Sequence, residues 1–153
     1  MVKKFGFVLT SVLSVMVVAG LVSIVAAQAK YGTAAEAKAM LEKAVAAVKA
    51  NKAKALTEFT KGEGGFKDRD LYPYCGGPDG NFTAHPSLVG KSLKDLKDKA
   101  GKPFGADMYK VAAEGKISEV SYMWPRPGET EPVKKELYFT KVGDQICAVG
   151  FYK

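Results

Sequence analysis

The segment 71–85 constrains the fold more than any other part of the chain. Its first residues favour β-strands, and its one proline suits a strand start or a sheet edge. The run 76–81 follows, in which glycine, proline, aspartate and asparagine supply the backbone angles of a tight turn. The extended pattern resumes at Phe82 and ends at His85, because Pro86 disfavours helical angles at the residue before it. We therefore predict a β-hairpin with the single histidine at its lip.

The start of the chain has the pattern of an export signal. Two lysines precede an apolar run over residues 5–27, and an Ala-Gln-Ala motif offers the small residues that signal peptidase accepts. We expect residues 1–29 to be a cleaved signal peptide and residues 30–153 to form one domain. The alternative is an uncleaved anchor in the inner membrane, since the apolar run approaches the ~20 residues of a membrane span. Both interpretations make the domain periplasmic or secreted.

The charge distribution argues against nucleic-acid binding. The chain has a formal net charge of +7, from 23 basic and 16 acidic residues. Arg69 and Arg126 are its only arginines, although guanidinium groups are prominent in phosphate recognition. The modest positive charge fits a preference for small anionic molecules better.

Catalytic and metal-binding chemistry also has little support. His85 is the single histidine, and together with two cysteines it forms no convincing catalytic constellation. It has no partner at a recognisable metal spacing, and Asp68 and Asp70 lack the further oxygen ligands of a calcium loop. We expect a protein that is not an enzyme and that holds no cofactor or metal.

Cys75 and Cys147 each fall in a predicted strand. In an oxidising compartment they could form a disulfide, provided that the two strands are neighbours. Loop-entropy models predict that a disulfide closing a loop of this length stabilises the folded protein by about 4 kcal/mol. The alternative is a pair of buried, unpaired small side chains. The residues alone leave both possibilities open.

The rest of the chain predicts one long helix, two short ones and three further strands. Apolar residues recur at three- and four-residue steps over 34–60, with a capping box from Thr33 and Glu36 at the start. Short amphipathic segments cover 92–97 and 104–112. Alternating patterns then predict strands at 117–124, 133–142 and 145–152. The expected fold is α+β, with a five-stranded antiparallel sheet, a long N-terminal helix and short helices on one side.

This order of elements resembles an extracytoplasmic PAS-like sensor fold, and several residues resemble those of the single Cache domain of the second type. These residues are Asp79-Gly80, His85-Pro86, Gly90-Lys91, Gly101, Phe104, Met108, Tyr122-x-Trp124-Pro125, Lys135-x-x-Tyr138 and Gly150-Phe151-Tyr152. The resemblance covers essentially the whole chain after the signal segment. It implies that one face of a curved sheet binds small molecules, often short carboxylic acids. Nothing follows Lys153, so the chain looks like a stand-alone Cache protein that signals through another protein.

The resemblance points to Lys135 as the cation that neutralises a bound anion. Most lysines on strands are solvated edge charges, but the match to Lys135-x-x-Tyr138 distinguishes this one from Lys134. His85 could donate a hydrogen bond to a carboxylate, or it could serve only to shape the turn before Pro86.

Aromatic residues supply the remaining candidates for the ligand-binding site. Tyr122 and Trp124 share one strand face and could wall a pocket while offering O–H and N–H donors, or they could simply pack in the core. Arg126 could grip a carboxylate from its loop, or be a free surface charge. The candidate set is completed by Tyr72, Met108 and Tyr138.

We therefore expect an extracytoplasmic sensor of short organic acids that passes its signal to a membrane-bound kinase or chemoreceptor. The helix over 34–60 is a candidate homodimer interface. The alternative is a structural or protein–protein interaction module of the periplasm without a small ligand. A cavity lined by the candidate residues would favour sensing, whereas solid packing of the same side chains would favour interaction.

Overall fold

The structure, a computed structural model, describes residues 29–153. Almost all of the expected signal peptide or anchor therefore lies outside the described residues. Within the described range, no helix is both long and apolar enough to cross a membrane.

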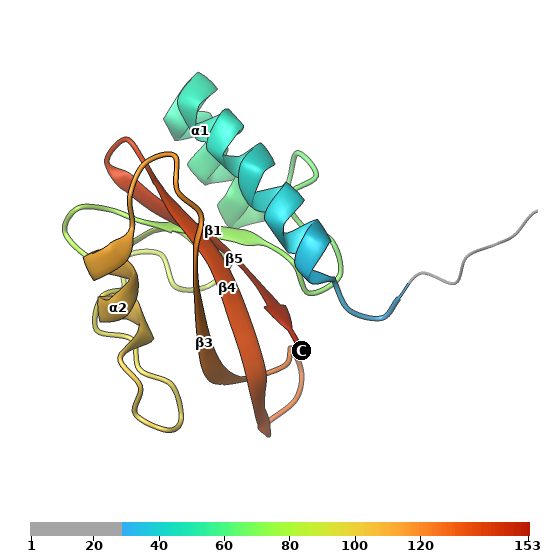
Figure 1. The fold of residues 1–153 in the computed structure, drawn as a ribbon. Coiled ribbons are helices and arrows are strands. Elements are labelled where there is room, and N and C mark those ends of the chain that lie inside the picture. Colours follow the sequence, from blue (N-terminus) through green and yellow to red (C-terminus); the bar gives the residue numbers. More distant parts are fainter. Residues whose placement is uncertain (1–28) are drawn as a thin grey trace, which may run out of the picture.

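A five-stranded antiparallel sheet forms the centre of the domain (Figure 1). Its strands are β1 (Pro73–Gly76), β2 (Phe82–Ala84), β3 (Ser118–Pro125), β4 (Pro132–Val142) and β5 (Gln145–Tyr152). The spatial order is β2-β1-β5-β4-β3, so the last strand lies between the N-terminal hairpin and the two strands that precede it. The expected α+β fold is confirmed, including the hairpin of β1 and β2.

Helix α1 (Ala34–Lys61) covers one face of the sheet. The expected capping box is present at Thr33 and Glu36, and Gly62 ends the helix in the left-handed conformation at φ 70°. The helix is not continuous, because Asn51 leaves the helical region at φ −159°, ψ 95°. The Asn51 side chain then accepts a hydrogen bond from the N–H of Lys54 at 3.1 Å and so caps a second helical segment. The buried side chains on this face form the helix-side core, which includes Ala37, Leu41, Ala44, Phe59, Leu71, Cys75, Cys147 and Val149.

The segment between β2 and β3 covers the opposite face (Figure 1). It contains α2 (Phe104–Val111), whereas the helical turn expected at 92–97 forms no helix. Ser92 still accepts the N–H of Asp95 at 3.1 Å, as a capping residue would. The start of α2 lies so close to this turn that a Cβ at Gly105 would be 2.0 Å from the carbonyl oxygen of Leu93. The buried side chains here form the loop-side core, which includes Tyr74, Phe82, Leu93, Phe104, Met108, Leu137, Phe139 and Ala148.

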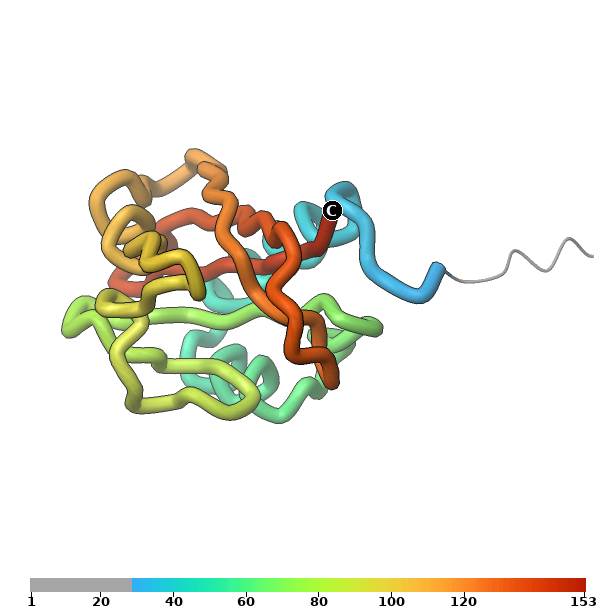
Figure 2. Tube along the Cα trace, turned by 90° about the horizontal axis from the view of Figure 1, so that it is seen from below, coloured from blue at the N-terminus to red at the C-terminus, as the bar shows by residue number. Residues whose placement is uncertain are grey.

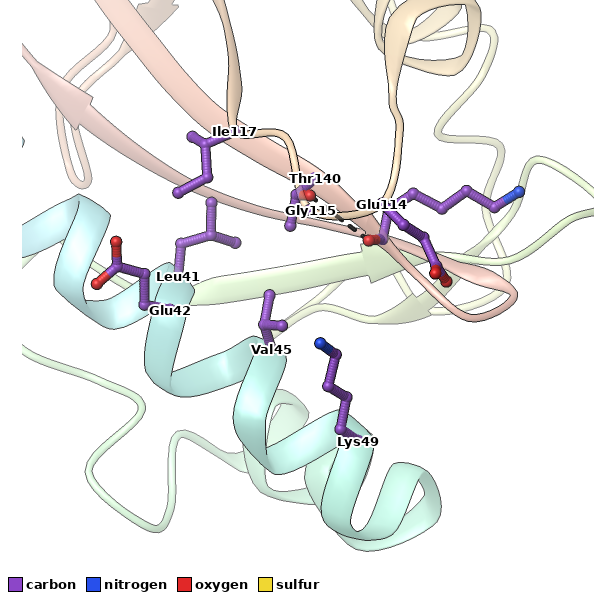
Figure 3. Close-up of a pocket in the computed structure, with 9 residues that line it drawn as sticks. Leu41, Glu42, Val45, Lys49, Glu114, Gly115, Ile117 and Thr140 are labelled. Atoms are coloured by element: carbon purple, nitrogen blue, oxygen red, sulfur yellow. Dashed lines mark hydrogen bonds between the residues drawn. The ribbon is translucent and has the colours of Figure 1, made fainter.

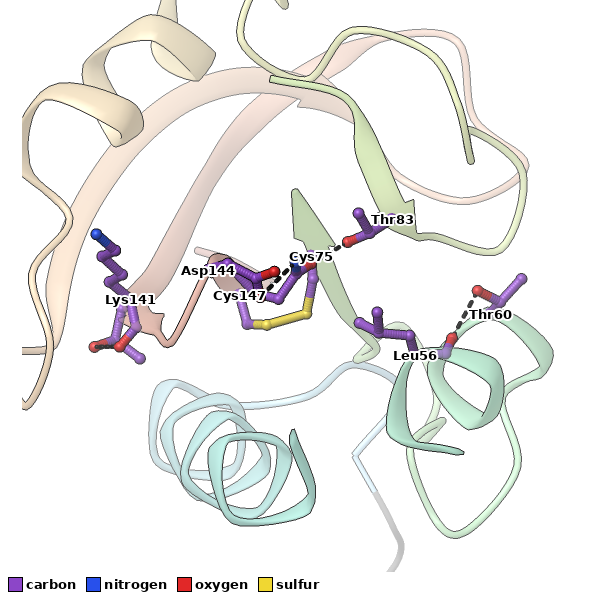
Figure 4. Close-up of a disulfide and its surroundings, with 9 residues drawn as sticks. Leu56, Thr60, Cys75, Thr83, Lys141, Asp144 and Cys147 are labelled. Carbon is purple, nitrogen blue, oxygen red and sulfur yellow. Dashed lines mark hydrogen bonds between the residues drawn. A yellow bond between two sulfur atoms is a disulfide. The ribbon is translucent and has the colours of Figure 1, made fainter. Parts of the chain in front are cut away.

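Cys75 and Cys147 form a disulfide that joins β1 to β5 (Figure 4). The two residues are directly opposite each other in the antiparallel register, so the strands are neighbours as the bridge requires. Both residues are fully buried in the helix-side core. Of the two possibilities that the sequence left open, the structure confirms the disulfide.

Candidate functional site

A cavity of about 250 Å³ lies between the loop-side face of the sheet and the segment that covers it. Its walls are mainly aromatic and apolar, and its charged or polar side chains are few. Five of the residues expected to bind a ligand line it together: Tyr72, His85, Tyr122, Trp124 and Lys135. A small, mostly apolar cavity with a few converging polar groups is the usual form of a small-molecule site.

A larger groove of about 580 Å³ lies on the other side of the molecule, between α1 and β4 (Figure 3). Leu41 and Val45 of α1 face Ile117 across it, and Glu42 and Lys49 lie along its rim. None of the residues expected to bind a ligand lines this groove. We therefore take the smaller cavity as the candidate site.

Lys135 of β4 supplies the charge of the cavity. It is 5% exposed, and its Nζ lies 4.6 Å from the ring centroid of Tyr152 and 5.6 Å from that of Tyr72. Within residues 29–153, no carboxylate lies within ion-pair distance of it. Burial lowers the pKa of Lys135 to about 8, and the weaker attraction of Asp70 acts in the opposite direction. Lys135 is thus a buried cation that stays largely charged at neutral pH and is held by ring faces.

Strand pairing explains how Lys135 reaches this position. Lys135 pairs with Tyr122 on β3 and with Tyr152 on β5, so the three side chains form a row across the sheet. Gly150 makes room for the lysine stem, because a Cβ there would lie 2.7 Å from Cε of Lys135. A larger residue at position 150 would push the ammonium group out of its place.

His85 follows β2, and the structure shows one of the two roles expected for it, that of shaping the turn at Pro86. Its Nδ1 accepts a hydrogen bond from the N–H of Ser87 at 3.0 Å, which shapes the turn after the strand. A nitrogen that accepts this bond carries no proton, so the neutral ring holds its proton on Nε2. Burial, together with the weaker effect of the nearby Lys135 charge, lowers the pKa of His85 to about 4. His85 is therefore a neutral hydrogen-bond donor at physiological pH.

Tyr122 and Trp124 lie on the cavity face of β3. The Tyr122 ring stacks on Phe104 at 4.1 Å between centroids, and Trp124 lies 5.9 Å from Tyr122. Burial raises the pKa of Tyr122 well above its usual value, so its hydroxyl stays protonated. In the part of the chain that the structure describes, neither the Tyr122 hydroxyl nor the Trp124 indole N–H donates to another protein group. Both donors are available to a ligand.

Three of the expected site residues, Met108, Tyr138 and Arg126, do not line the cavity. Met108 lies behind its wall, where its sulfur accepts a 3.9 Å hydrogen bond from the Tyr74 hydroxyl. Tyr138 is on the opposite face of the sheet, where it stacks on Phe151 at 5.2 Å between centroids. Side chains alternate along a strand, so a residue three positions after Lys135 cannot share its face. The placement of Tyr138 at the site is therefore corrected.

Arg126 lies outside the cavity, in an adjoining hollow of about 460 Å³. This outer hollow shares Tyr72, His85 and Trp124 with the cavity. The Arg126 guanidinium carbon lies 4.8 Å from the ring centroid of Tyr31 and 5.3 Å from that of Tyr152. Arg126 is thus packed between two rings beside the cavity, so it is not a free surface charge.

Two residues of the adjoining outer hollow were missed from the sequence. Tyr152 could have been found, because the turn at 143–144 pairs Val142 with Gln145 and so fixes Lys135 opposite Tyr152. Asp70 gives no comparable signal. It is 6% exposed at the outer hollow, where Oδ1 accepts the N–H of Gly32 at 2.6 Å and Oδ2 has no partner among the described residues.

Comparison with known proteins gives one family and several similar structures. The family model for the single Cache domain 2 matches residues 12–145. The crystal structure of a methyl-accepting chemotaxis protein from Vibrio parahaemolyticus is 26% identical, covers 77% of this chain and 86% of its own, and superposes with a TM-score of 0.62. No curated protein sequence matches significantly.

Two further structures share the fold at lower identity. One is described as the structural basis for carboxylic acid recognition by a Cache chemosensory domain, at 24% identity and a TM-score of 0.56. The other is the periplasmic sensor domain of a chemotaxis protein, at 21% identity and a TM-score of 0.57. Both cover 77% of this chain, and they cover 86% and 88% of their own chains.

Proposed function

The chain belongs to the single Cache domain 2 family, and from this premise we propose that it is an extracytoplasmic sensor that binds a small carboxylate in the cavity around Lys135. The observation that carries the proposal is a buried cation that has no anionic partner among residues 29–153, beside hydrogen-bond donors that are unpaired in the same range. Burying a charge without a partner is unfavourable, so such a group is a candidate for function. One of the structural relatives is described by its recognition of a carboxylic acid, and that ligand class suits the chemistry of this cavity.

The cavity offers the positive charge and the hydrogen-bond donors that must replace the hydration shell of a bound carboxylate. Lys135 supplies the charge, while Tyr122, Trp124 and Nε2 of His85 supply directed donors. The aromatic walls exclude water and thereby strengthen each of these interactions. The volume of about 250 Å³ is below the ~300–1,000 Å³ of drug-sized sites, which favours acids of a few carbon atoms.

A thermal-shift screen tests the proposal directly. Short organic acids are compared with their uncharged amides, which have nearly the same shape but no anionic group. A ligand at a hundred times its dissociation constant is expected to stabilise the protein by about 2.7 kcal/mol, which corresponds to a rise in melting temperature of several degrees. The amides should give no shift. No response to any acid, or an equal response to an acid and its amide, would contradict the proposal.

Affinity for the acid is expected to fall as pH rises above about 8. The ligand needs the charged form of Lys135, whose pKa is about 8 in the free protein, so binding weakens by nearly tenfold per pH unit beyond that value. The other titratable groups around Lys135 are His85, Asp70 and the tyrosines of the cavity. His85 is neutral throughout this window and burial keeps Tyr72 and Tyr122 protonated, so they do not mask the effect. Calorimetric titration between pH 6.5 and 9.5 measures it, and a flat profile would show that Lys135 does not hold the anion.

The partner and the location are further parts of the proposal. We place residues 30–153 in the periplasm after cleavage of residues 1–29, and we propose a membrane-bound kinase or chemoreceptor as the recipient of the signal. Two of the structurally similar proteins are described as parts of chemotaxis proteins, which supports a role of this kind. Dimerisation through α1 is proposed as well.

A further inference from the structure

The segment that covers the cavity is attached to the free edge of β3. We call residues 96–104 the roof, because its two end residues, Leu96 and Phe104, both line the cavity. Strand β3 is the last strand of the sheet, so no further strand among residues 29–153 pairs with its outer edge. Figures 1 and 2 both show the segment between β2 and β3 beside this strand. The roof can therefore take up backbone groups that the sheet leaves unpaired.

Two side chains of the roof bind the backbone of this edge. Asp98 Oδ2 accepts the N–H of Met123 at 2.9 Å, and Lys102 Nζ donates to the carbonyl oxygen of Ser121 at 2.5 Å. Backbone groups of an antiparallel edge strand point alternately towards the neighbouring strand and away from it, so both of these groups point away from β4. Met123 stands between the two residues of β3 that line the cavity. The roof is thus attached to β3 at the level of the candidate site.

The second oxygen of Asp98 holds the roof in its own shape. Asp98 Oδ1 accepts the N–H groups of Ala100 and Lys102, both at 2.9 Å. Asp98 is 8% exposed, and its hydrogen bonds, above all the one from Met123, lower its pKa, so the carboxylate is charged at neutral pH. One buried carboxylate therefore joins the turn of the roof to the edge of the sheet.

The two ends of the roof follow the position of this turn. The Gly105 N–H donates to the carbonyl oxygen of Leu96 at 3.3 Å, which joins the ends to each other. Phe104 stacks on Tyr122 at 4.1 Å between ring centroids and lies 6.2 Å from Trp124. A movement of the turn away from β3 would therefore shift Leu96 and Phe104, which form one wall of the cavity.

We propose that Asp98 is a positioning residue of the candidate site, which holds the roof against β3 and thereby limits the length of the molecule that the cavity accepts. Asp98 does not itself line the cavity, so it acts through Leu96 and Phe104. Without the attachment, the roof separates from β3, water enters between the rings, and longer molecules fit. The effect on ligand affinity rests on the proposed function, whereas the position of the roof can be measured without a ligand.

Asp98→Asn separates the two roles of the carboxylate. The asparagine Oδ1 can still accept from Ala100 and Lys102, as asparagine does in many turns of this kind. Its NH₂ group would then face the N–H of Met123, and two donors cannot form a hydrogen bond. The variant therefore keeps the turn of the roof and loses its attachment to β3.

The first measurement is hydrogen exchange of the Met123 amide in the ligand-free protein. Loss of a hydrogen bond to a charged group is expected to speed exchange of this amide roughly ten- to a hundredfold in Asp98→Asn. The Trp124 amide points towards β4, and it should exchange as in the wild type, which separates the local effect from a general loss of stability. Unchanged exchange at Met123 would overturn the proposal.

The second measurement follows the roof itself through Trp124, the only tryptophan of the chain. Acrylamide, a neutral quencher, should quench its fluorescence more strongly in Asp98→Asn, because Phe104 no longer covers the ring. Thr140→Val is the matched control. It removes a buried hydroxyl that donates to the carbonyl oxygen of Ala113 at 3.1 Å beside the groove of α1, so it should lower stability but leave the quenching unchanged. Faster Met123 exchange without stronger quenching in Asp98→Asn would show that the roof stays in place without Asp98, and would overturn the proposal.

The third measurement compares straight-chain carboxylates from acetate to hexanoate by calorimetric titration at pH 7. The wild type should lose affinity once the chain is longer than the cavity. Asp98→Asn should bind the shortest acids about tenfold more weakly, because contacts with the roof are lost, and its preference should shift to longer acids. The same order of affinities in both proteins would overturn the proposal. If no acid bound the wild type but Trp124 quenching increased in Asp98→Asn, the carboxylate ligand would be refuted and the positioning of the roof by Asp98 would be supported.

Discussion

Lys135→Met is expected to abolish binding of small carboxylates and at the same time to stabilise the fold. Methionine keeps the length of the side chain but removes the one cation that lines the cavity among the residues that the structure describes. Removing one neutral hydrogen-bond donor from a charged ligand typically costs ~1.5–3 kcal/mol of binding free energy. Removing the counter-ion of an anion in a largely dry site costs more than that. We therefore expect the affinity to fall by more than about a hundredfold. Isothermal titration with the acid found by screening provides the measurement.

The gain in stability follows from the pKa of the same group. Burial lowers the pKa of Lys135 from 10.5 to about 8, so folding with a charged lysine is unfavourable by about 3 kcal/mol at neutral pH. An apolar residue of similar volume avoids this penalty, and we expect a net gain of about 1–3 kcal/mol once lost ring contacts are included. Chemical denaturation at pH 7 measures the gain.

The pH dependence of the unfolding free energy checks whether the buried charge of Lys135 destabilises the fold. The folded pKa of Lys135 lies below the unfolded one, so the unfolded wild type binds more protons between about pH 8 and 10.5. Its stability should therefore rise with pH from 8 towards 10, whereas Lys135→Met lacks this contribution. The stability difference between the two proteins should narrow over the same range.

Lys134→Met is the matched control. Its side chain is 55% exposed and faces away from the cavity. We expect neither the affinity nor the stability to change appreciably. If Lys135→Met bound acids as well as Lys134→Met, another residue would hold the anion. If Lys135→Met were less stable than the wild type, Lys135 would be a structural residue.

Local pattern was sufficient to predict most of the fold, because each element carries its own periodicity and capping residues. The capping box of Thr33 and Glu36 and the alternation along β4 are both present as expected. Asn51 was the exception in the helix. The amphipathic pattern continues across it, so the interruption depends on the alternative hydrogen bond of a single side chain.

The residues of the candidate site could be predicted where the pairing of neighbouring strands alone determines their positions. Tyr122 and Lys135 come together because β3 and β4 pair directly. The placement of Tyr138 at the site failed because it followed a motif match and ignored alternation along the strand. Asp70 could not be predicted, since its role depends on the approach of Gly32 from a distant part of the chain.

The disulfide between Cys75 and Cys147 is expected to contribute a large part of the stability of the domain. The two residues are 72 positions apart in sequence, and loop-entropy models give such a closure about 4 kcal/mol. Domains of this size are typically stable by only ~5–15 kcal/mol. The native protein should resist a reductant, because both residues are fully buried, and reduction should require denaturant. Guanidinium denaturation of the oxidised protein and of protein refolded in reductant measures the difference.

Binding by the reduced protein tests how the disulfide relates to the site. The bridge lies in the helix-side core, whereas the candidate cavity is on the opposite face of the sheet. We therefore expect reduced protein that remains folded to bind the same acid with nearly unchanged affinity.

The double variant Cys75→Ala with Cys147→Ala should lose at least as much stability as reduction does, since it also removes two packed sulfur atoms. A stability difference below about 1 kcal/mol on reduction would mean that the β1–β5 pairing holds without the bridge. A large loss of affinity in folded, reduced protein would mean that the two faces of the sheet are coupled through β5.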